Sequence, residues 1–400
     1  MIIYPRRVLS SLAGFLLALW LVVGRWSINR VESENVIPTL MRPRGWAVLG
    51  LIVCAAALMV PYPGASNRRL GARVWLAALS AAGFLGYMCV TSFWSPETLS
   101  ASQKFVDLVQ VLLVLAATLV IAVRGDLESV TRSLIKGVVV LTILLAGTGL
   151  IAALHGDGER LAVLGGGPNV FGRLMGLLAV WGSIRFAQRN APIPAVLAVA
   201  AIALLILSGS RGAMVSVVVA VAFGQLVASP GKRLAVSALL GLGILAVIGL
   251  TPLGDAVVDM FRLRVLELTI GEGNLAHRGE IYRLAMDRGL RYPVLGWGLG
   301  SFVSTGWPYA HNLFLEAWSE GGIVGVLLVL ASVVSGLTAI LRDAGEERAM
   351  LKGWFVLIVV AAQFSGDIFD SRAIFILPLL ALASERTGTP AAVAAMRRAP

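Results

Sequence analysis

The hydrophobic pattern divides the chain into long apolar runs separated by short polar segments. A helix needs about 20 apolar residues to cross the hydrocarbon core of a bilayer, and most of the runs approach this length. The apolar residues are continuous, whereas they would alternate with polar ones in the strands of a membrane barrel. The pattern therefore predicts an all-α, polytopic membrane protein with about twelve transmembrane helices. The predicted spans are 8–24, 46–62, 74–93, 105–123, 134–154, 168–187, 192–208, 212–228, 233–250, 312–341, 351–366 and 372–385.

The composition supports this class, and we treat residues 1–400 as a single membrane domain. Hydrophobic residues make up 58% and charged residues 14% of the chain, whereas soluble domains contain about 25% charged residues. The first run follows Arg6 and Arg7 but lacks a small-residue cleavage pattern, so we expect an uncleaved first helix. Cys54 and Cys89 lie inside apolar runs and are interpreted as small hydrophobic residues. No Cys or His spacing typical of a metal site occurs, and we expect no metal and no cofactor.

The net charge of +11 is explained by membrane topology. If both termini are cytoplasmic, Lys and Arg far outnumber Asp and Glu in the cytoplasmic segments and nearly balance them on the other side. This asymmetry follows the positive-inside rule, so the basic charge does not predict nucleic-acid binding. The segment 25–45 is an exception, because it is placed outside and carries four arginines.

The longest hydrophilic segment, 251–311, joins the ninth and tenth predicted spans and is therefore placed on the outer, periplasmic side. We expect it to contain amphipathic helices. ATP is absent on that side, so a reaction there requires a substrate that is already activated.

Arg211 lies in the tight outer turn Ser208–Ala213 between two apolar runs. A charge at the membrane boundary is costly unless it reaches water or is paired. Arg211 is either a snorkelling interfacial arginine or an anion clamp, because a guanidinium matches phosphate oxygens two at a time.

The segment 276–288 has the pattern of an amphipathic helix lying over the membrane. Arg288 falls inside its apolar stripe and Arg278 lies at the edge of that stripe, so both point toward the bundle. This position favours a bound anion, although an acidic partner such as Glu316 would serve equally well. The stripe consists of Ile281, Leu284 and Ala285, and the opposite, solvated face of Glu280, Arg283 and Asp287.

His311 ends the long loop directly before a predicted span. Histidine changes its charge near neutral pH, so at a cavity it can accept a proton from a hydroxyl nucleophile. The alternative is an interfacial histidine at a helix start, with Asn312 capping the helix. Arg173 and Asp107 are ionisable groups within spans, and we expect them to form a pair that lines a cavity.

Three segments together resemble the O-antigen ligase and O-antigen polymerase family of bacterial envelope enzymes. They are Ser210–Ala213 at a span start, Arg278 with Pro293–Gly298 in the long loop, and His311-Asn312 before a span. The turn Gly167-Pro168-Asn169 is also similar to a turn in this family. The resemblance covers about half the chain by motif and the whole chain by topology.

The spacing after the histidine favours the ligase branch. In ligases a histidine is followed by Asn, Ser or Gln, then by nine residues, then by a glycine and by a small or aromatic residue three further on. Here Gly322 and Gly325 follow His311-Asn312 at that spacing. A second ligase pattern, which begins with Arg and ends with Leu, fits both Arg160–Leu164 and Arg173–Leu177. Because it fits twice in a Leu-rich chain, it contributes little to the choice between ligase and polymerase.

The resemblance implies transfer of a glycan from undecaprenyl diphosphate to a sugar hydroxyl of lipid A–core, at the periplasmic face of the bacterial inner membrane, without ATP or metal. It implies that Arg211 and Arg278 bind the departing diphosphate, with Arg288 as a further cation, and that His311 acts as the base or positions the acceptor. Such a displacement inverts the anomeric centre. Further substrate-binding residues are expected to be Asn169, Arg173 and Asn312, and the expected partners are the donor, the acceptor and membrane lipids.

Three other functions are compatible with parts of the pattern. A polymerase would use the same donor with a second lipid-linked glycan as acceptor. A transporter would show repeated halves and a site near the bilayer midplane, but the sequence has no evident repeat and its arginines gather at one face. The third alternative is a structural membrane protein.

Overall fold

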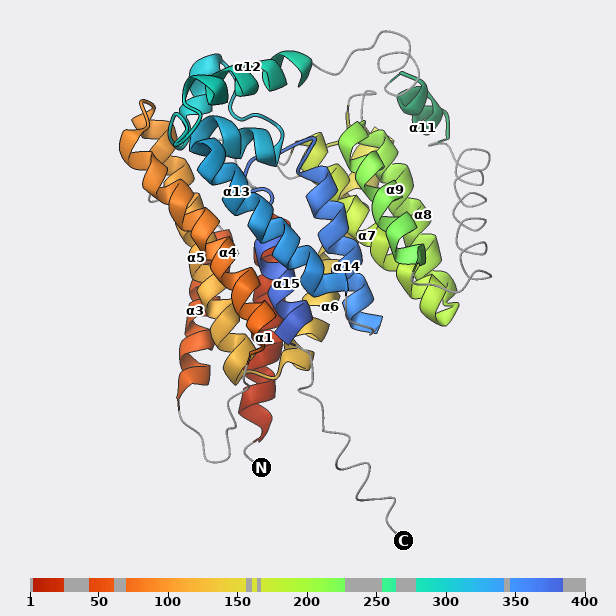
Figure 1. Cartoon of the computed structure of the whole chain (residues 1–400). Coiled ribbons are helices and arrows are strands. Elements are labelled where there is room, and N and C mark those ends of the chain that lie inside the picture. The colour runs from red at the N-terminus through yellow and green to blue at the C-terminus, as the bar shows by residue number, and fades with distance from the viewer. Residues whose placement is uncertain are drawn as a thin grey trace.

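A computed structural model describes residues 3–24, 43–60, 70–155, 160–163, 167–226, 254–263, 278–341 and 346–383. Within these residues the regular structure is entirely helical, and the helices form an upright bundle (Figure 1). The helices are α1 (Ile3–Val23), α3 (Pro43–Met59), α4 (Ala72–Thr91), η1 (Ser92–Trp94), α5 (Thr98–Arg124), α6 (Leu127–His155), α7 (Pro168–Arg189), α8 (Pro192–Leu207), α9 (Arg211–Leu226), α11 (Gly254–Phe261), α12 (Arg278–Arg291), η3 (Ser301–Thr305), α13 (Leu313–Leu341), α14 (Glu346–Ala361) and α15 (Ala373–Ala383).

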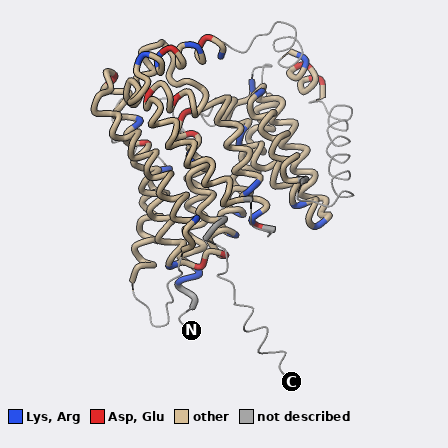
Figure 2. The backbone as a smooth tube through the Cα atoms, viewed as in Figure 1, with Lys and Arg blue, Asp and Glu red and all other residues tan. Residues whose placement is uncertain are grey.

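The helices confirm a polytopic membrane protein. Six of them are long and apolar enough to cross a bilayer, namely α1, α4, α5, α6, α7 and α13. The helices α3, α8 and α9 are apolar but shorter. Each predicted run corresponds to a helix except 233–250, which lies outside the described residues. Figure 2 shows charged residues concentrated toward the two ends of the bundle.

Two helices extend well beyond their predicted runs. The helix α5 begins at Thr98 and α6 at Leu127, about two turns before the apolar runs at 105 and 134. Polar residues continue a helix as long as their backbone hydrogen bonds do, so the apolar run marks the buried or lipid-facing part of a helix and not its end.

The helix α12 lies across one end of the bundle, over α13 (Figure 1). On the face of α12 that packs on the bundle, Ile281 and Ala285 are buried, whereas Arg283 and Asp287 on the opposite face are exposed. The predicted amphipathic helix is confirmed, and Arg278 and Arg288 are half-buried, as expected for its inward face.

The helix α13 is broken at Gly322, which has φ 61° and ψ −160°. The break frees backbone groups of the helix, and the turn 293–298 binds them. Trp297 N–H donates to Ser319 C=O at 3.0 Å, and Gly298 N–H donates to Glu320 C=O at 2.9 Å. A membrane-embedded helix can be interrupted where neighbouring protein satisfies its backbone, and the turn does so here. The predicted continuous span 312–341 is therefore two helical segments.

Buried ion pairs connect helices inside the bundle. Lys104 Nζ of α5 lies 2.6 Å from Glu316 and 2.7 Å from Glu320 of α13. Glu316 therefore pairs with Lys104, and not with the arginines of α12. The pair expected between Asp107 and Arg173 is wrong, because Asp107 pairs with Arg44 at 3.0 Å.

Candidate functional site

The turn between α8 and α9 carries Arg211 as the first residue of α9. Arg160 holds this turn from outside, because its Nε donates to Ser208 C=O at 3.2 Å and its Nη2 to Gly209 C=O at 3.4 Å. The same Nη2 lies 3.3 Å from Asn169 Oδ1 at the start of α7. Asn169 thus lies beside the Arg211 turn, and Arg160 joins the two.

His311 has a left-handed backbone, with φ 55°. A non-glycine residue in this region is uncommon and costs free energy, and such residues cluster at functional sites. The imidazole packs edge-on against Tyr309, with ring centroids 4.5 Å apart. Its Nδ1 is buried and has no hydrogen-bond partner among the described residues.

The electrostatic surroundings of His311 keep its imidazole neutral at pH 7. Burial, and after it the positive charge of Arg278, lower the pKa of His311 to about 4, although Asp370 acts in the opposite direction. A neutral imidazole accepts a proton, so His311 is in the protonation state that a base requires.

Arg278 is the first residue of α12 and lies close enough to His311 for its positive charge to lower the pKa of the imidazole. Burial lowers the pKa of the Arg278 guanidinium, which still remains protonated at pH 7. One helical turn further on, the Tyr282 hydroxyl donates to Gln363 C=O at 2.9 Å. Burial raises the pKa of Tyr282, so its hydroxyl also keeps its proton.

Asn312 caps α13, as the capping interpretation predicts. Its Oδ1 accepts the N–H groups of Phe314 and Leu315, both at 3.0 Å. Its Nδ2 donates to Gln363 C=O at 3.3 Å. The side chain therefore fixes the start of α13 and, with it, the residue before it, His311.

The turn after α14 joins the Arg211 turn to the His311 region. Gln363 contacts Tyr282 and Asn312. The next residue, Phe364, packs on Gly212, where a Cβ atom would lie 2.4 Å from the Phe364 Cβ. Only glycine allows this approach, so the sequence Arg211-Gly212 brings a cation and a close backbone contact to the same place.

Arg288 lies in a different cluster. Its guanidinium stacks 4.0 Å over the Trp297 ring and donates to Ser301 C=O at 3.0 Å and to Ser304 Oγ at 2.6 Å. Ten residues along a helix separate it from Arg278, which corresponds to about 15 Å. Its contacts fix α12 to the turn and to η3, and its binding of substrate stays a prediction.

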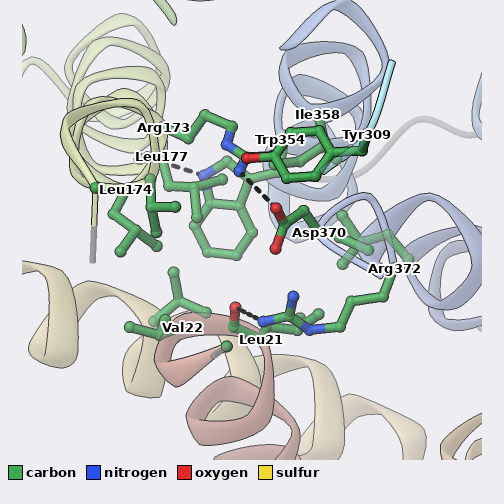
Figure 3. Close-up of a pocket in the computed structure, with 16 residues that line it drawn as sticks. Leu21, Val22, Arg173, Leu174, Leu177, Tyr309, Trp354, Ile358, Asp370 and Arg372 are labelled. Atoms are coloured by element: carbon green, nitrogen blue, oxygen red, sulfur yellow. Dashed lines mark hydrogen bonds and ion pairs between the residues drawn. The ribbon is translucent and has the colours of Figure 1, made fainter. Parts of the chain in front are cut away.

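A cavity of about 230 Å³ lies between α1, α6, α7, α14 and α15 (Figure 3), and Tyr309, the ring that packs on His311, is part of its wall. Arg173, Asp370 and Tyr309 form its polar side, and Leu174 and Leu177 are among its apolar walls. Arg173 Nη2 lies 3.7 Å from Asp370 Oδ2. Arg173 therefore lines a cavity as predicted, but with Asp370 as its partner.

These features define a multi-pass membrane protein with a cationic, histidine-containing site at one end of its helix bundle. Residues 196–330, which include Arg211, Arg278 and His311, match the family model described as O-antigen ligase. This match covers about a third of the chain and supports the resemblance to the O-antigen ligase and polymerase family that the motifs predict, and it does not separate the two branches. The match supports a role related to glycosyl transfer in O-antigen assembly. No curated protein matches the chain.

The sequence patterns missed three residues that the structure places at the site. Gln363 lies near the end of the predicted span 351–366, and Asp370 and Tyr309 lie just outside predicted spans. A usable signal was present for Asp370, because Asp367 and Asp370 lie in the short segment between two apolar runs and Arg372 begins the second run. Gln363 acts through its backbone oxygen, for which the sequence carries no signal.

Proposed function

We propose that this protein is an O-antigen ligase that transfers a glycan from undecaprenyl diphosphate to a sugar hydroxyl of lipid A–core. The reaction takes place at the periplasmic face of the inner membrane and inverts the anomeric centre. Arginine side chains supply the positive charge that stabilises the leaving group, and the donor carries its own activation.

The observation that carries the proposal is the setting of His311. A neutral, half-buried imidazole is held in a left-handed backbone conformation and lies next to the guanidinium of Arg278. A base beside a cation suits a reaction in which a hydroxyl loses a proton while a diphosphate gains negative charge.

In the proposed reaction His311 takes the proton of the acceptor hydroxyl. The oxygen forms a bond to the anomeric carbon, and the bond from that carbon to the diphosphate oxygen breaks. The electron pair leaves on the diphosphate, where Arg211 and Arg278 stabilise the charge. The imidazolium then returns its proton to the released diphosphate or to water.

Donor binding should strengthen this base. The positive charge of Arg278 lowers the pKa of His311 in the empty site. A bound diphosphate offsets that charge, so the pKa of His311 rises when the donor is in place. The base becomes stronger only when there is a leaving group to displace.

Reconstitution tests the proposal. Purified protein in liposomes is supplied with undecaprenyl-diphosphate-linked glycan and lipid A–core, with and without a chelator of divalent metals. We expect glycan on lipid A–core in both cases, and loss of transfer in the His311→Ala and Arg211→Ala variants. Full transfer by both variants would contradict the assigned roles, and loss of transfer on chelation would contradict the arginine-based stabilisation.

The acceptor distinguishes the ligase from the polymerase. A ladder of longer lipid-linked glycans, formed without lipid A–core, would identify a polymerase. Glycan attached to lipid A–core, with no lengthening of the donor, identifies the ligase.

A further inference from the structure

We infer that the cavity lined by Arg173, Asp370 and Tyr309 is the acceptor subsite, in which one sugar ring bonds through its hydroxyls to Arg173 and Asp370 and lies against Tyr309. The inference rests on the proposed function and adds to it the residues that select and position the acceptor. These are positioning residues, whereas His311 exchanges the proton.

The polar side of the cavity contains a hydrogen-bond donor group, Arg173, and an acceptor group, Asp370. The separation of 3.7 Å between Arg173 Nη2 and Asp370 Oδ2 is longer than a hydrogen bond. Arg173 is only 7% exposed, and a guanidinium carries five N–H donors. In Figure 3 the Arg173 and Asp370 side chains face each other as a pair on the cavity wall, with Tyr309 pointing toward Arg173. A ligand with hydroxyl groups can bond to both members of this pair.

The charges favour a neutral polyol over a phosphate. Asp370 would repel an anion placed next to Arg173, whereas adjacent sugar hydroxyls can accept from the guanidinium and donate to the carboxylate. The third charged wall residue, Arg372, directs its Nη2 to the carbonyl groups of Trp20 and Leu21, at 3.0 and 2.7 Å. It thereby binds the last turn of α1, where a cation is favourable.

The size and walls of the cavity suit a single ring. Its volume of about 230 Å³ lies below the about 300–1,000 Å³ of pockets for drug-sized ligands. Leu174, Leu177 and Ile358 line it and can pack against the C–H faces of a pyranose. Trp354 is held there by donation of its Nε1–H to Leu177 C=O at 2.9 Å.

Two residues of the cavity wall link the ring to the base. Tyr309 is both a wall of the cavity and the packing partner of the His311 ring. Asp370, on the cavity wall, acts electrostatically on the same imidazole. Arg278 is not among the residues that line the cavity. Separate places for the hydroxyl and the diphosphate are what an inverting displacement requires, because the two oxygens lie on opposite sides of the anomeric carbon.

Kinetics of the reconstituted protein test the inference with Asp370→Asn and Ala373→Leu. Asp370→Asn keeps the shape and removes the charge, and Ala373→Leu adds apolar bulk to the cavity wall without changing a charge. For both we expect the KM for lipid A–core to rise by about tenfold or more, with the KM for the lipid-linked donor unchanged. A soluble core oligosaccharide should compete with lipid A–core in the wild type and compete less well in both variants.

The matched control is Asp287→Asn, the same change on the solvent-exposed face of α12, for which both KM values should equal those of the wild type. Elution as a single species and an unchanged thermal midpoint show that each variant is folded. Unchanged acceptor KM in both variants, or a rise in donor KM as large as that in acceptor KM, would overturn the inference. Absence of transfer by the wild type would instead contradict the proposed function.

Discussion

His311 combines a strained backbone with a functional side chain. The left-handed conformation, at φ 55°, suits glycine best and is unfavourable for a residue with a Cβ atom. The helix cap formed by Asn312, the next residue, holds the chain in this conformation. We infer that this unfavourable conformation is retained because the imidazole is needed for activity. Replacement of His311 by glycine should therefore lower the activity without lowering the stability.

We predict that His311→Gly is at least as stable as the wild type but transfers glycan about 10²–10⁴-fold more slowly, because it lacks the base. His311→Ala should be equally inactive but less stable than His311→Gly, because alanine keeps the cost of the left-handed backbone, about 1–2 kcal/mol. Thermal unfolding in detergent and transfer rates in liposomes measure the two effects. If the alanine variant is the more stable of the two, the backbone strain is not real.

The pKa of His311 predicts how activity depends on pH. Burial and then Arg278 lower this pKa from 6.5 to about 4, so the free enzyme keeps a neutral base well below pH 6. We expect the acid limb of kcat/KM to fall near pH 4 and not near pH 6.5. Removal of the opposing charge in Asp370→Asn should move this limb to still lower pH. A limb at pH 6.5 in both proteins would show that His311 is solvated or that another group limits the rate.

At the scale of single elements, the break in α13 carries the next prediction. A Cβ atom at Gly322 would lie 2.4 Å from Val294 C=O, and the residue has a positive φ. Gly322→Ala should therefore separate the turn from α13, lower the thermal midpoint and reduce transfer, since His311 lies just before the same helix. Gly86→Ala in α4 is the control, because nothing lies within 4 Å of its Cβ position and alanine favours a helix. Equal behaviour of the two variants would contradict the importance of the break.

The same elements show what the hydrophobic pattern predicts. Apolar runs locate helices because lipid requires them, and the stripe on α12 was visible as a helical period. The break in α13 was not visible, because Gly321 and Gly322 lie inside the predicted span 312–341 and glycine alone does not end a membrane helix. A break becomes stable only when the turn around Trp297, distant in sequence, binds the freed carbonyl groups.

At the scale of the whole molecule, the site depends on which helices are neighbours. Family motifs marked Arg211, Arg278 and His311, although nothing in their spacing shows that the turn at Gln363 joins them. The partners of buried charges follow the same rule. Asp107 faces Arg44 because α5 packs on α3, and Arg173 faces Asp370 because the segment before α15 packs on α7. One-dimensional patterns identify ionisable groups in spans but not the helix that lies opposite.

The orientation of the bundle in the membrane is the last prediction. The helix α12 lies across one end of the bundle (Figure 1), and the charge asymmetry of the sequence predicts that this end faces the periplasm. Both native cysteines are buried, so single cysteines can be introduced in a Cys54→Ala, Cys89→Ala background. Asp287→Cys on α12 and Glu128→Cys at the start of α6 are both at exposed positions. In intact spheroplasts a membrane-impermeant thiol reagent should label Asp287→Cys only, and Glu128→Cys should react after permeabilisation. The reverse pattern would place the site where ATP is present, and the argument for a pre-activated lipid-linked donor would then fail.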